Sequence, residues 1–584
     1  MGKGIVKLGE GQWALKDGNL LAAKETNGRF KNAEFTVTRG TDATYVGKDG
    51  LIKKASFYNL IDYSEDFDET TSDWTNTNVS VETNSTISPQ GINNAAKITE
   101  DTSNSEHQIQ FVFSQTINTN YSYSVFVKAN GRNYCGMNIG ASRLYANFDL
   151  TDGSVTNVQS NGTDFNNESA SITSFGNGWY KCTLSGYALT INGSYVRFTL
   201  RNVESSNSFL NYLGNGTSGV YIWGAQLVEG TEALDYQYTN GKEGIPRIDF
   251  TDNTDGHLLL EPESTNLIPY SEDFEQWTSS NLTPTSGQSS AITSSNDAWL
   301  FTATAILANV TLSVSSSGAN TLSVFAKAGT QDGIFIRFSG SSNPRAAFNL
   351  SNGTLIGSGG GVTSSNVEAF NDGWYRISIT GTDNVTDARI YVADSTGNFV
   401  SSGNIYVQNA QLEALPYPTS YIPTNGGQVT RDAEIVQRES IDEIDIPQEE
   451  GTIYLELKEY KQNTEIFNFD RSTSNSIHVG TDSNGVLKVW GYYEPSGTGT
   501  SVQVTLSANT SKVAIAFKNG SFIVYADGEE ELNTSTFVWT PTDSIDRLYF
   551  NRGGYVASQG LSKVKALRIY KEAFNTTQLD ELTS

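Results

Sequence analysis

Two nearly identical nonapeptides stand 207 residues apart in this chain. NLIDYSEDF begins at Asn59 and NLIPYSEDF begins at Asn266, so eight of the nine letters agree. Four more pairs of segments match in the same order: SVFVKA (124–129) with SVFAKA (323–328), ANFDLTDGSV (146–155) with AAFNLSNGTL (346–355), GNGWYKCTL (176–184) with NDGWYRISI (371–379), and VYIWGAQLVEG (220–230) with IYVQNAQLEAL (405–415). Length differences therefore lie between the matched blocks, where loops tolerate insertions. The sequence predicts two copies of one domain of about 160–180 residues.

The residue pattern within each copy indicates β-strands. Tyr121, Tyr123 and Val125 alternate with Ser122 and Ser124, and a period of two places one set of side chains on a buried face. Glycine-containing turns, TDGS and SNGT, recur between such segments, and helical periodicity is nearly absent. Many short strands with regular turns are typical of an all-β fold, and we expect two antiparallel jelly-roll sandwiches in series.

Residues 427–584 have a different pattern. The strand GTIYLELK, a hairpin around Asn519-Gly520 and the strand VKALRIYK come first. The chain then ends in NTTQLDELTS, where Asn575 can cap a short helix and Gln578 stands three residues later. This order of strands followed by a terminal helix resembles the concanavalin-like (laminin-G-like) sandwich. The resemblance implies a third antiparallel sandwich.

Both cysteines align with an aliphatic residue of the other copy. Cys135 stands opposite Ile334, and Cys182 stands opposite Ile377. We therefore expect two small buried hydrophobic side chains, which free cysteines often provide. A disulfide between Cys135 and Cys182 stays open at this point.

The sequence has no recognisable catalytic or cofactor motif. His107, His257 and His478 stand at no known spacing from a nucleophile or metal ligand, and no phosphate loop, zinc spacing or nucleophile elbow is present. Calcium takes roughly six to eight oxygen ligands, and the acidic pairs in the nonapeptides, Glu65–Asp66 and Glu272–Asp273, supply too few. We expect no enzyme and no cofactor, and a structural calcium ion is possible but unsupported. We interpret the nonapeptides as latches at the entry of each domain.

Charge limits the partners of this chain. With 64 acidic and 38 basic residues, its formal net charge is −26. Nucleic acid and anionic membranes are therefore poor partners. No apolar run approaches the roughly 18 residues that a membrane-spanning helix needs, so we expect no membrane insertion. The first residues, MGKGIVKLGEGQWALKDG, lack the apolar core of a signal peptide.

Three further phrases carry a family resemblance. FTVTRGTDATYVGKDGLI (35–52), IPRIDFTDNTDGHLLLEPESTNLIPYSEDF (245–274) and PTSYIPTNGGQVTRDAEIV (418–436) are similar to phrases in structural proteins of tailed bacteriophages. In that family the first phrase usually runs directly into the second, but here a complete sandwich separates them. We interpret the first copy as a domain inserted into a framework. The resemblance implies a tail or head fibre located in the virion, attached through its N-terminal end and commonly homotrimeric.

The expected organisation has five parts. An N-terminal anchor or framework segment (1–58) precedes the first jelly-roll sandwich (59–238). A framework linker (239–265) leads to the second jelly-roll sandwich (266–426). The concanavalin-like sandwich with its terminal helix (427–584) completes the chain. We expect the N-terminal segment to bind other virion proteins and the third sandwich to point away from the virion.

Three functions fit this sequence. The first is a non-catalytic phage fibre whose carbohydrate-binding-like sandwiches attach to host-surface glycans, with duplication providing avidity. The second is a purely structural capsid decoration or tail connector. The third is a bacterial surface adhesin or accessory glycan-binding protein. Candidate glycan-contact aromatics are Trp223, which replaces Gln408 of the other copy, and the cluster Trp490, Tyr492 and Tyr493; ordinary core positions are the alternative for all four.

Overall fold

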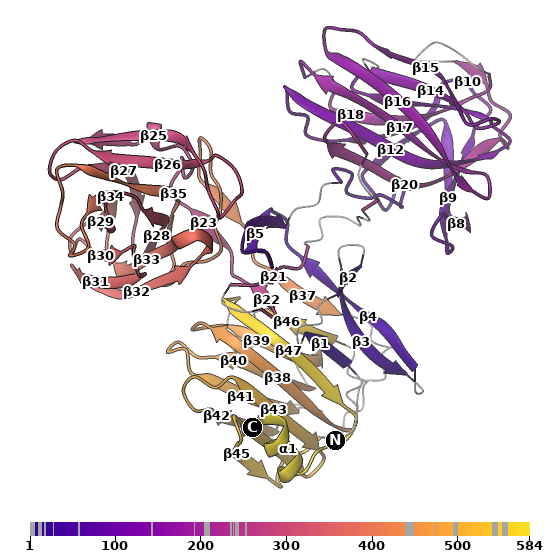
Figure 1. Ribbon diagram of the computed structural model, residues 1–584. Helices are drawn as coiled ribbons and strands as arrows, with labels where there is room; N and C mark the ends of the chain where they lie inside the picture. Colours follow the sequence, from indigo (N-terminus) through magenta and orange to yellow (C-terminus); the bar gives the residue numbers. More distant parts are fainter. Residues whose placement is uncertain are drawn as a thin grey trace. The chain divides into compact units, whose positions relative to one another are not determined.

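The chain folds into two compact units, of which one is an insertion in the other. Phe57–Glu243 form the inserted unit, and Met1–Ser56 together with Gly244–Ser584 form the second unit (Figure 1). The computed structural model describes residues 6–9, 14–16, 19–26, 29–55, 59–141, 144–191, 193–203, 211–233, 236–237, 239, 245–251, 254–438, 449–472, 475–493, 500–539, 547–551 and 559–584.

The inserted unit is an antiparallel β-sandwich, called sandwich 1 below. Its two main sheets have the strand orders β15–β14–β13–β18–β11–β7 and β16–β17–β12–β20–β9–β8. A short β10–β19 pair lies beside them. The strands are β7 (Trp74–Thr77), β8 (Val79–Ile87), β9 (Asn93–Glu100), β10 (Asn104–Ser105), β11 (His107–Val112), β12 (Thr119–Asn130), β13 (Tyr134–Ile139), β14 (Leu144–Asp149), β15 (Ser154–Ser160), β16 (Phe165–Gly176), β17 (Trp179–Ala188), β18 (Tyr195–Arg201), β19 (Tyr212–Leu213) and β20 (Gly219–Glu229).

The second copy of the repeat folds into sandwich 2. Its sheets have the orders β31–β30–β29–β34–β27–β24 and β32–β33–β28–β35–β26–β25. Its helical turns are η1 (Phe274–Gln276) and η2 (Asn371–Gly373). The strands are β24 (Thr278–Ser280), β25 (Leu282–Gln288), β26 (Ala298–Ala303), β27 (Asn309–Ser316), β28 (Ala319–Ala328), β29 (Gly333–Ser339), β30 (Arg345–Asn349), β31 (Thr354–Gly359), β32 (Val362–Ala369), β33 (Trp374–Thr382), β34 (Val385–Ala393) and β35 (Gly403–Glu413).

The two sandwiches share one topology. Counted along the chain, every strand of the two main sheets of sandwich 1 has a counterpart at the same place in sandwich 2. The central strand β12, for example, lies between β17 and β20, as β28 lies between β33 and β35. Even the irregularity of register recurs, after Ser124 in β12 and after Ser323 in β28. The predicted pair of equivalent antiparallel sandwiches is confirmed.

A third sandwich, the C-terminal sandwich, is built from three separate stretches of sequence. One sheet has the order β45–β44–β43–β38–β47, with β1 and β22 both pairing with the free edge of β47. The other sheet has the order β42–β41–β40–β39–β46–β37–β4. The strands β2 and β1 pair with β3, β3 pairs with β4, and β21 pairs with β22.

The strands of this sandwich come from both ends of the chain and from its middle. They are β1 (Val6–Gly9), β2 (Ala14–Lys16), β3 (Asn19–Thr26), β4 (Arg29–Thr38), β21 (Ile248–Asp249), β22 (His257–Leu260), β37 (Ile435–Arg438), β38 (Glu450–Tyr460), β39 (Glu465–Ser472), β40 (Asn475–Thr481), β41 (Leu487–Tyr493), β42 (Thr500–Thr505), β43 (Lys512–Lys518), β44 (Ser521–Ala526), β45 (Glu529–Thr534), β46 (Arg547–Phe550) and β47 (Ser562–Tyr570).

This arrangement corrects the expected role of the N-terminal segment. The sequence predicts an anchor (1–58) and a linker (239–265) separate from the third sandwich, yet β1, β4 and β22 are strands of its sheets. The reason is backbone pairing, because the edges of β47 and β37 present hydrogen-bonding groups that a neighbouring strand satisfies. The N-terminal segment and the third sandwich therefore cannot point in opposite directions.

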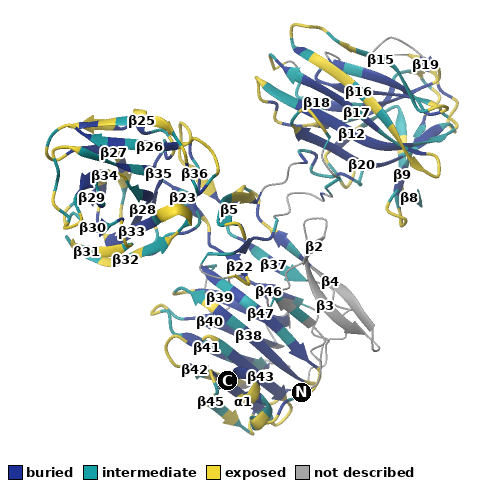
Figure 2. Cartoon of the chain, in the orientation of Figure 1, coloured by how far each residue is buried: buried dark blue, intermediate teal, exposed yellow. Residues whose placement is uncertain are grey.

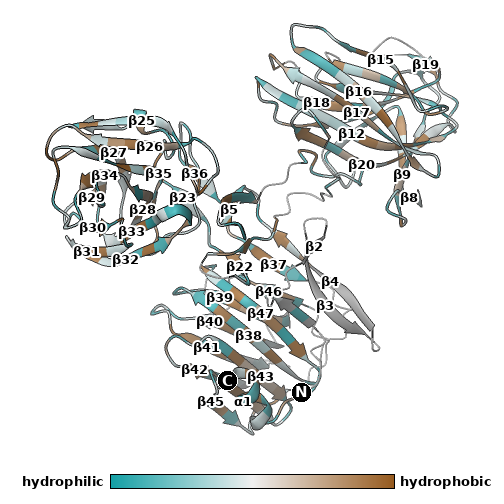
Figure 3. Cartoon of the chain, viewed as in Figure 1, coloured by the Kyte–Doolittle hydropathy of each residue, from teal (hydrophilic) through white to brown (hydrophobic). Residues whose placement is uncertain are grey.

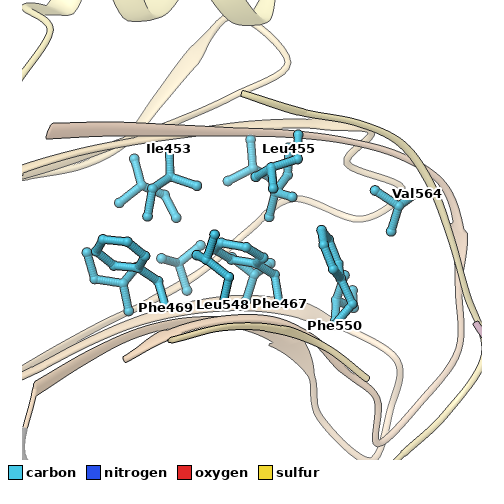
Figure 4. Packing of buried hydrophobic residues seen from close by; sticks show 14 of the residues in the cluster. Ile453, Leu455, Phe467, Phe469, Leu548, Phe550 and Val564 are labelled. Atoms are coloured by element: carbon cyan, nitrogen blue, oxygen red, sulfur yellow. The ribbon is translucent and has the colours of Figure 1, made fainter. Parts of the chain in front are cut away.

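The core of the C-terminal sandwich lies between its two sheets. Figure 4 shows Phe467, Phe469 and Phe550 rising from one sheet toward Ile453 and Leu455 of the other. Side chains from β4, β21 and β22 enter the same core (Phe35, Val37, Ile248, Leu258 and Leu260). Burial alternates residue by residue along β41, from Leu487 to Tyr493, which is the period of two that a half-buried strand needs. Figure 3 shows hydrophobic and hydrophilic residues mixed along the described strands of this sandwich.

The terminal helix α1 (Thr576–Thr583) has the predicted capping box. The Asn575 side chain accepts the backbone N–H of Gln578, and the Gln578 side chain accepts the backbone N–H of Asn575. Leu579 and Leu582 are buried against β43 and β44. Within the described residues, the structure contains no helix whose length and apolar character would let it cross a membrane.

Burial in the repeat departs from the sequence pattern at the central strands. Tyr121, Tyr123 and Val125 are fully buried as predicted, but Ser122 and Ser124 on the opposite face are only 0% and 1% exposed. The edge strand β16, by contrast, is exposed over most of its length (Figure 2). The outer face is therefore covered over its central strands. Ser122 and Ser185 of this face share a hydrogen bond of 2.8 Å, which satisfies their hydroxyl groups while they are buried.

The two cysteines are free and buried in the core of sandwich 1. Both are 0% exposed. Burial raises the pKa of the Cys182 thiol well above its ordinary value, so it stays protonated and unreactive. The interpretation as small hydrophobic side chains is confirmed.

Candidate functional site

Two of the four aromatic candidates are core residues. Trp223 in β20 is 2% exposed, and its ring lies 5.1 Å from that of Phe126 and 4.4 Å from that of Tyr236. Tyr493 in β41 is 5% exposed and belongs to the core of the C-terminal sandwich. A sugar stacks on an exposed ring face, so burial removes both from the candidates.

In the equivalent cluster of sandwich 2, Ile52 of strand β6 (Ile52–Ala55) packs among the aromatic rings.

Trp490 and Tyr492 lie together on the outer face of the C-terminal sandwich. Both are half-buried, and the alternation along β41 turns them away from the core that Tyr493 enters. The neighbouring strands place polar residues beside the two rings (Ser476 and His478 from β40, Ser501 and Gln503 from β42). Trp490 and Tyr492 therefore stay candidates for glycan contact, whereas burial removes Tyr493.

A buried polar group lies next to this aromatic pair. The Asn468 amide donates to Glu465 at 2.9 Å, and His478 Nδ1 lies 3.6 Å from the same carboxylate. Arg547 forms an ion pair of 3.1 Å with the buried Asp470. These side chains come from β39, β40 and β46, so sheet register brings together residues that are distant in sequence. Spacing along the sequence gives no sign of this group.

The repeated nonapeptides form latches, as predicted. The Asn59 amide nitrogen donates to the carbonyl oxygens of Ala225 and Gln237 at 3.1 and 3.0 Å. Its amide oxygen accepts the N–H groups of Ile61 and Leu227, both at 3.1 Å. Asn59 is 3% exposed, so one side chain satisfies four buried backbone groups at the beginning and end of sandwich 1.

The second latch repeats the first. Asn266 donates to Ala410 and Ile422 at 3.3 and 2.8 Å and accepts from Ile268 and Leu412 at 3.1 and 3.2 Å. A serine follows in both copies and bonds the tyrosine and threonine of a closing phrase (Ser64 with Tyr236 and Thr239, Ser271 with Tyr421 and Thr424). The sequence comparison missed that YQYT (236–239) is the counterpart of YIPT (421–424).

The acidic residues of the latches belong to the same hydrogen-bond networks. Glu65 accepts the Tyr236 hydroxyl at 2.9 Å, and Glu272 accepts the Tyr421 hydroxyl at 3.2 Å. In the part of the chain that the structure describes, no three His, Cys, Asp or Glu side chains gather as a metal site would require. The carboxylates therefore support the latch.

Replacing either latch asparagine is expected to destabilise only its own sandwich. Asn59→Ala or Asn266→Ala leaves buried N–H and C=O groups without partners, which costs about 2–3 kcal/mol of unfolding free energy. Hydrogen exchange of the backbone amides, resolved by peptide, measures the effect in each sandwich. Each variant is the control for the other, and equal loss of protection in both sandwiches would contradict independent latches.

The three framework phrases meet in a buried ion cluster. It joins Arg39, Arg247 and Arg431 to Glu261 and Glu434, and all five side chains are at most 2% exposed. Glu261 lies 2.8 Å from Arg247 and 2.9 Å from Arg431. Glu434 bonds both Arg39 and Arg247. The cluster connects sandwich 2 to the C-terminal sandwich, because Ser420 of the closing phrase also donates to Glu261 at 2.7 Å.

Electrostatics keeps this cluster ionised. Burial raises the pKa of Glu261, but the positive charges of Arg431 and Arg247 outweigh it and lower that pKa to about 2. A buried carboxylate is stable only while such partners remain. The resemblance to phage structural proteins therefore rests on phrases whose charged residues hold the framework together, and these residues are not available to an external ligand.

Each histidine lies beside one carboxylate, in three separate places. His107 is 3.5 Å from Asp101, His257 is 3.4 Å from Asp249, and His478 is 3.6 Å from Glu465. Burial lowers the pKa of His257, which favours the neutral imidazole. The absence of an enzyme activity stays a prediction.

Both repeats carry a row of hydroxyl groups across the outer face of the same sheet. In sandwich 1, Ser185 donates to Ser122 at 2.8 Å, and Ser169 of β16 is paired with Ser185. In sandwich 2, Thr321 and Thr380 share a hydrogen bond of 2.8 Å, and the next residue in the row is Ser364. We call these residues the hydroxyl rows. The sequence shows them only as alternate positions in matched strands.

A hollow lies over the hydroxyl row of sandwich 1. Its volume is about 380 Å³, and its lining includes Asn120, Asn166, Ser169, Ser185, Tyr187 and Thr231. None of the lining side chains carries a formal charge. Sandwich 2 has a hollow in the same place, since Ser364, Thr380 and Pro416 of its lining align with Ser169, Ser185 and Thr231. Two copies of one sheet face therefore retain both hydroxyl groups and a space above them.

Comparisons with known proteins give structural neighbours only. No family model and no curated protein matches this chain. A Ruminococcus gnavus IT-sialidase CBM40 bound to α2,3-sialyllactose is 12% identical, covering 25% of this chain and 92% of its own, with a TM-score of 0.22. A heptameric SAP-like pentraxin of Limulus polyphemus is 17% identical over 24% of this chain and 72% of its own (TM-score 0.20). The LG1-3 region of the laminin α2 chain is 9% identical over 80% and 96% (TM-score 0.17).

Proposed function

We propose that this chain is a non-catalytic fibre protein of a tailed-bacteriophage virion, on the tail or the head, that attaches the particle to glycans on the host surface. The observation that carries the proposal is the hollow over the hydroxyl row of sandwich 1, which recurs in sandwich 2. Hydroxyl and amide groups both donate and accept hydrogen bonds, as the hydroxyl groups of a sugar require. Tyr187 adds an aromatic side chain to the polar lining.

Multiple weak sites suit attachment. A site of millimolar affinity contributes only about 4 kcal/mol, which holds no particle on a cell. Linked sites raise the effective concentration of each other, so avidity exceeds single-site affinity by roughly 10²–10⁴. A homotrimer in contact with other virion proteins is part of this proposal, and the sequence resemblance supports it. Sedimentation analysis of the purified chain measures that oligomeric state.

A structural decoration or connector protein is the second candidate. Four apolar side chains of sandwich 1 are at least 60% exposed, as expected at a contact with another protein (Ile87, Val112, Ile191 and Leu213). This function would need no glycan. In this case the duplicated sandwich serves only to lengthen the protein.

The hollow of sandwich 1 can be tested directly. The double substitution Asn166→Ala and Tyr187→Ala removes an amide and a ring from its lining. We expect binding of the purified protein to host cells or to a glycan array to fall by about tenfold or more, because avidity multiplies the loss at each site. Tyr145→Ala is the matched control, since Tyr145 is a half-buried tyrosine on the other sheet. Equal binding by all three proteins would favour the structural candidate.

A further inference from the structure

Other parts of the same unit lie opposite the hydroxyl row of sandwich 2, and we call their side of the intervening cavity its roof. A cavity of about 270 Å³ separates the outer face of β32 and β33 from the framework and from the C-terminal sandwich. Arg376 and Ser378 line it on the sheet, whereas Tyr417, Glu459 and Lys563 line it on the roof. All of these residues belong to the compact unit formed by Met1–Ser56 and Gly244–Ser584. We call this cavity the chamber.

The floor of the chamber contains a buried donor. Arg376 is 9% exposed, and its Nη2 donates to the Thr419 carbonyl at 2.7 Å and to Ser323 at 3.1 Å. Its Nε is buried and has no hydrogen-bond partner among the described residues. Such a group costs free energy unless a partner reaches it, so this edge of the guanidinium is suited to an acceptor from a ligand.

The roof of the chamber supplies charges of both signs. Lys563 Nζ lies 3.2 Å from Glu459, and Lys461 Nζ lies 2.6 Å from the same residue. Burial lowers the pKa of Lys563, but Glu459, Glu368 and Asp249 outweigh it and raise that pKa above its ordinary value. Lys461 is also 5.9 Å from the centre of the Tyr417 ring. Donors, acceptors and an aromatic ring therefore surround one small space.

We propose that the chamber binds one neutral hexose-type unit of a glycan, in a site distinct from the open hollow of sandwich 1. Apart from Glu261, which the ion cluster occupies, the lining carries acidic and basic side chains in equal number (Asp249, Glu368 and Glu459 against Arg376, Lys461 and Lys563). A simple anion or cation would meet repulsion from one of these sets. A neutral polyol uses both, since each sugar hydroxyl donates to a carboxylate and accepts from a cation.

The chamber differs from the hollow in what it recognises. The hollow of sandwich 1 has an uncharged lining, whereas the framework and the C-terminal sandwich contribute charged residues to the lining of the chamber. In sandwich 1, Lys181 occupies the position of Arg376, and Thr173 occupies the position of Glu368. The duplication therefore gave two sites of different chemistry. This inference takes the sugar class from the proposed function.

A substitution that fills the chamber tests the proposal. Ser378→Leu extends a larger side chain from the sheet into it, and Lys563→Met removes a charge from the roof without changing the sheet. Thr183→Leu is the matched control, because Thr183 occupies the position of Ser378 in sandwich 1. Saturation-transfer NMR on the full-length proteins, with glucose, galactose, mannose and N-acetylglucosamine as separate probes at millimolar concentration, measures binding.

We expect at least one of these sugars to bind the unmodified protein and the Thr183→Leu variant equally. Ser378→Leu and Lys563→Met should each weaken that binding by about tenfold or more. Absence of binding by all four sugars overturns the proposal, and so does unchanged binding by Ser378→Leu. Neither result bears on cell attachment through sandwich 1, which the Asn166 and Tyr187 substitutions measure independently.

Discussion

Replacing Arg247 with methionine is expected to lower the unfolding free energy of the unit that contains sandwich 2 and the C-terminal sandwich by about 3–5 kcal/mol. Arg247 is 0% exposed and pairs with Glu261 at 2.8 Å and with Glu434. It also donates to the Thr44 carbonyl and the Ser420 hydroxyl, both at 2.7 Å. Its removal leaves two buried carboxylates short of a positive partner, and solvation cannot compensate them.

Urea denaturation followed by tryptophan fluorescence measures this loss. The matched control is Arg389→Met, because Arg389 forms a 2.7 Å ion pair with Asp387 but its side chain is 31% exposed. A partly exposed pair that water still reaches contributes about 1 kcal/mol or less. Equal destabilisation by the two substitutions would contradict the importance of burial in the cluster.

The pH dependence gives a second readout of the same variant. The pKa of Glu261 is about 2 in the folded protein and 4.5 is its ordinary value. A lowered native pKa stabilises the fold above the ordinary value, and this contribution is lost as pH falls from 4.5 toward 2. The stability advantage of the unmodified protein over Arg247→Met should therefore shrink through that range.

Deletion of residues 57–243 is expected to leave the remaining unit folded while reducing attachment to host cells by about tenfold or more. The deleted segment is one of the two compact units. Joining Ser56 directly to Gly244 restores the order in which the first phage-like phrase runs into the second. Adsorption to host cells and thermal unfolding are both measured on this shortened chain.

Contacts at both ends of the insertion support this expectation. On the framework side, the Arg39 guanidinium donates to the carbonyl oxygens of Ala55 at 2.6 Å and Ile245 at 3.2 Å. On the side of sandwich 1, Asn59 bonds the carbonyl oxygen of Gln237 at 3.0 Å. Arg39 thus holds the two ends of the framework together, and Asn59 holds the two ends of the insertion together. The excised residues 57–243, expressed alone, should also fold and provide the control.

The outcomes of the deletion separate the candidate functions. A folded chain with reduced adsorption supports glycan attachment through sandwich 1. A folded chain with unchanged adsorption supports the structural candidate, in which the insertion only adds length. If the shortened chain does not fold, residues 57–243 are not a domain inserted into an independently folding unit.

Local sequence determined most of the secondary structure and the internal symmetry. The matched blocks predicted two sandwiches with one topology, since equal patterns of alternating residues form equal strands. The Asn575 cap followed from residue types three positions apart, as helix capping depends on nearest neighbours. The aliphatic partners of Cys135 and Cys182 predicted buried thiols for the same reason, because a core position requires a certain volume and polarity whatever the residue.

Only the tertiary structure decided where the separate segments meet. Sheet pairing brought β1, β4 and β22 to the C-terminal sandwich, and hydrogen bonds between strand edges carry no signal in the order of residues. The tertiary structure also decided that both faces of β12 are buried, and that Trp223 lies in the cluster on its outer face. The ion cluster and the chamber each unite side chains hundreds of positions apart. Charge and shape complementarity between folded domains determine such contacts, and spacing along a single chain does not record them.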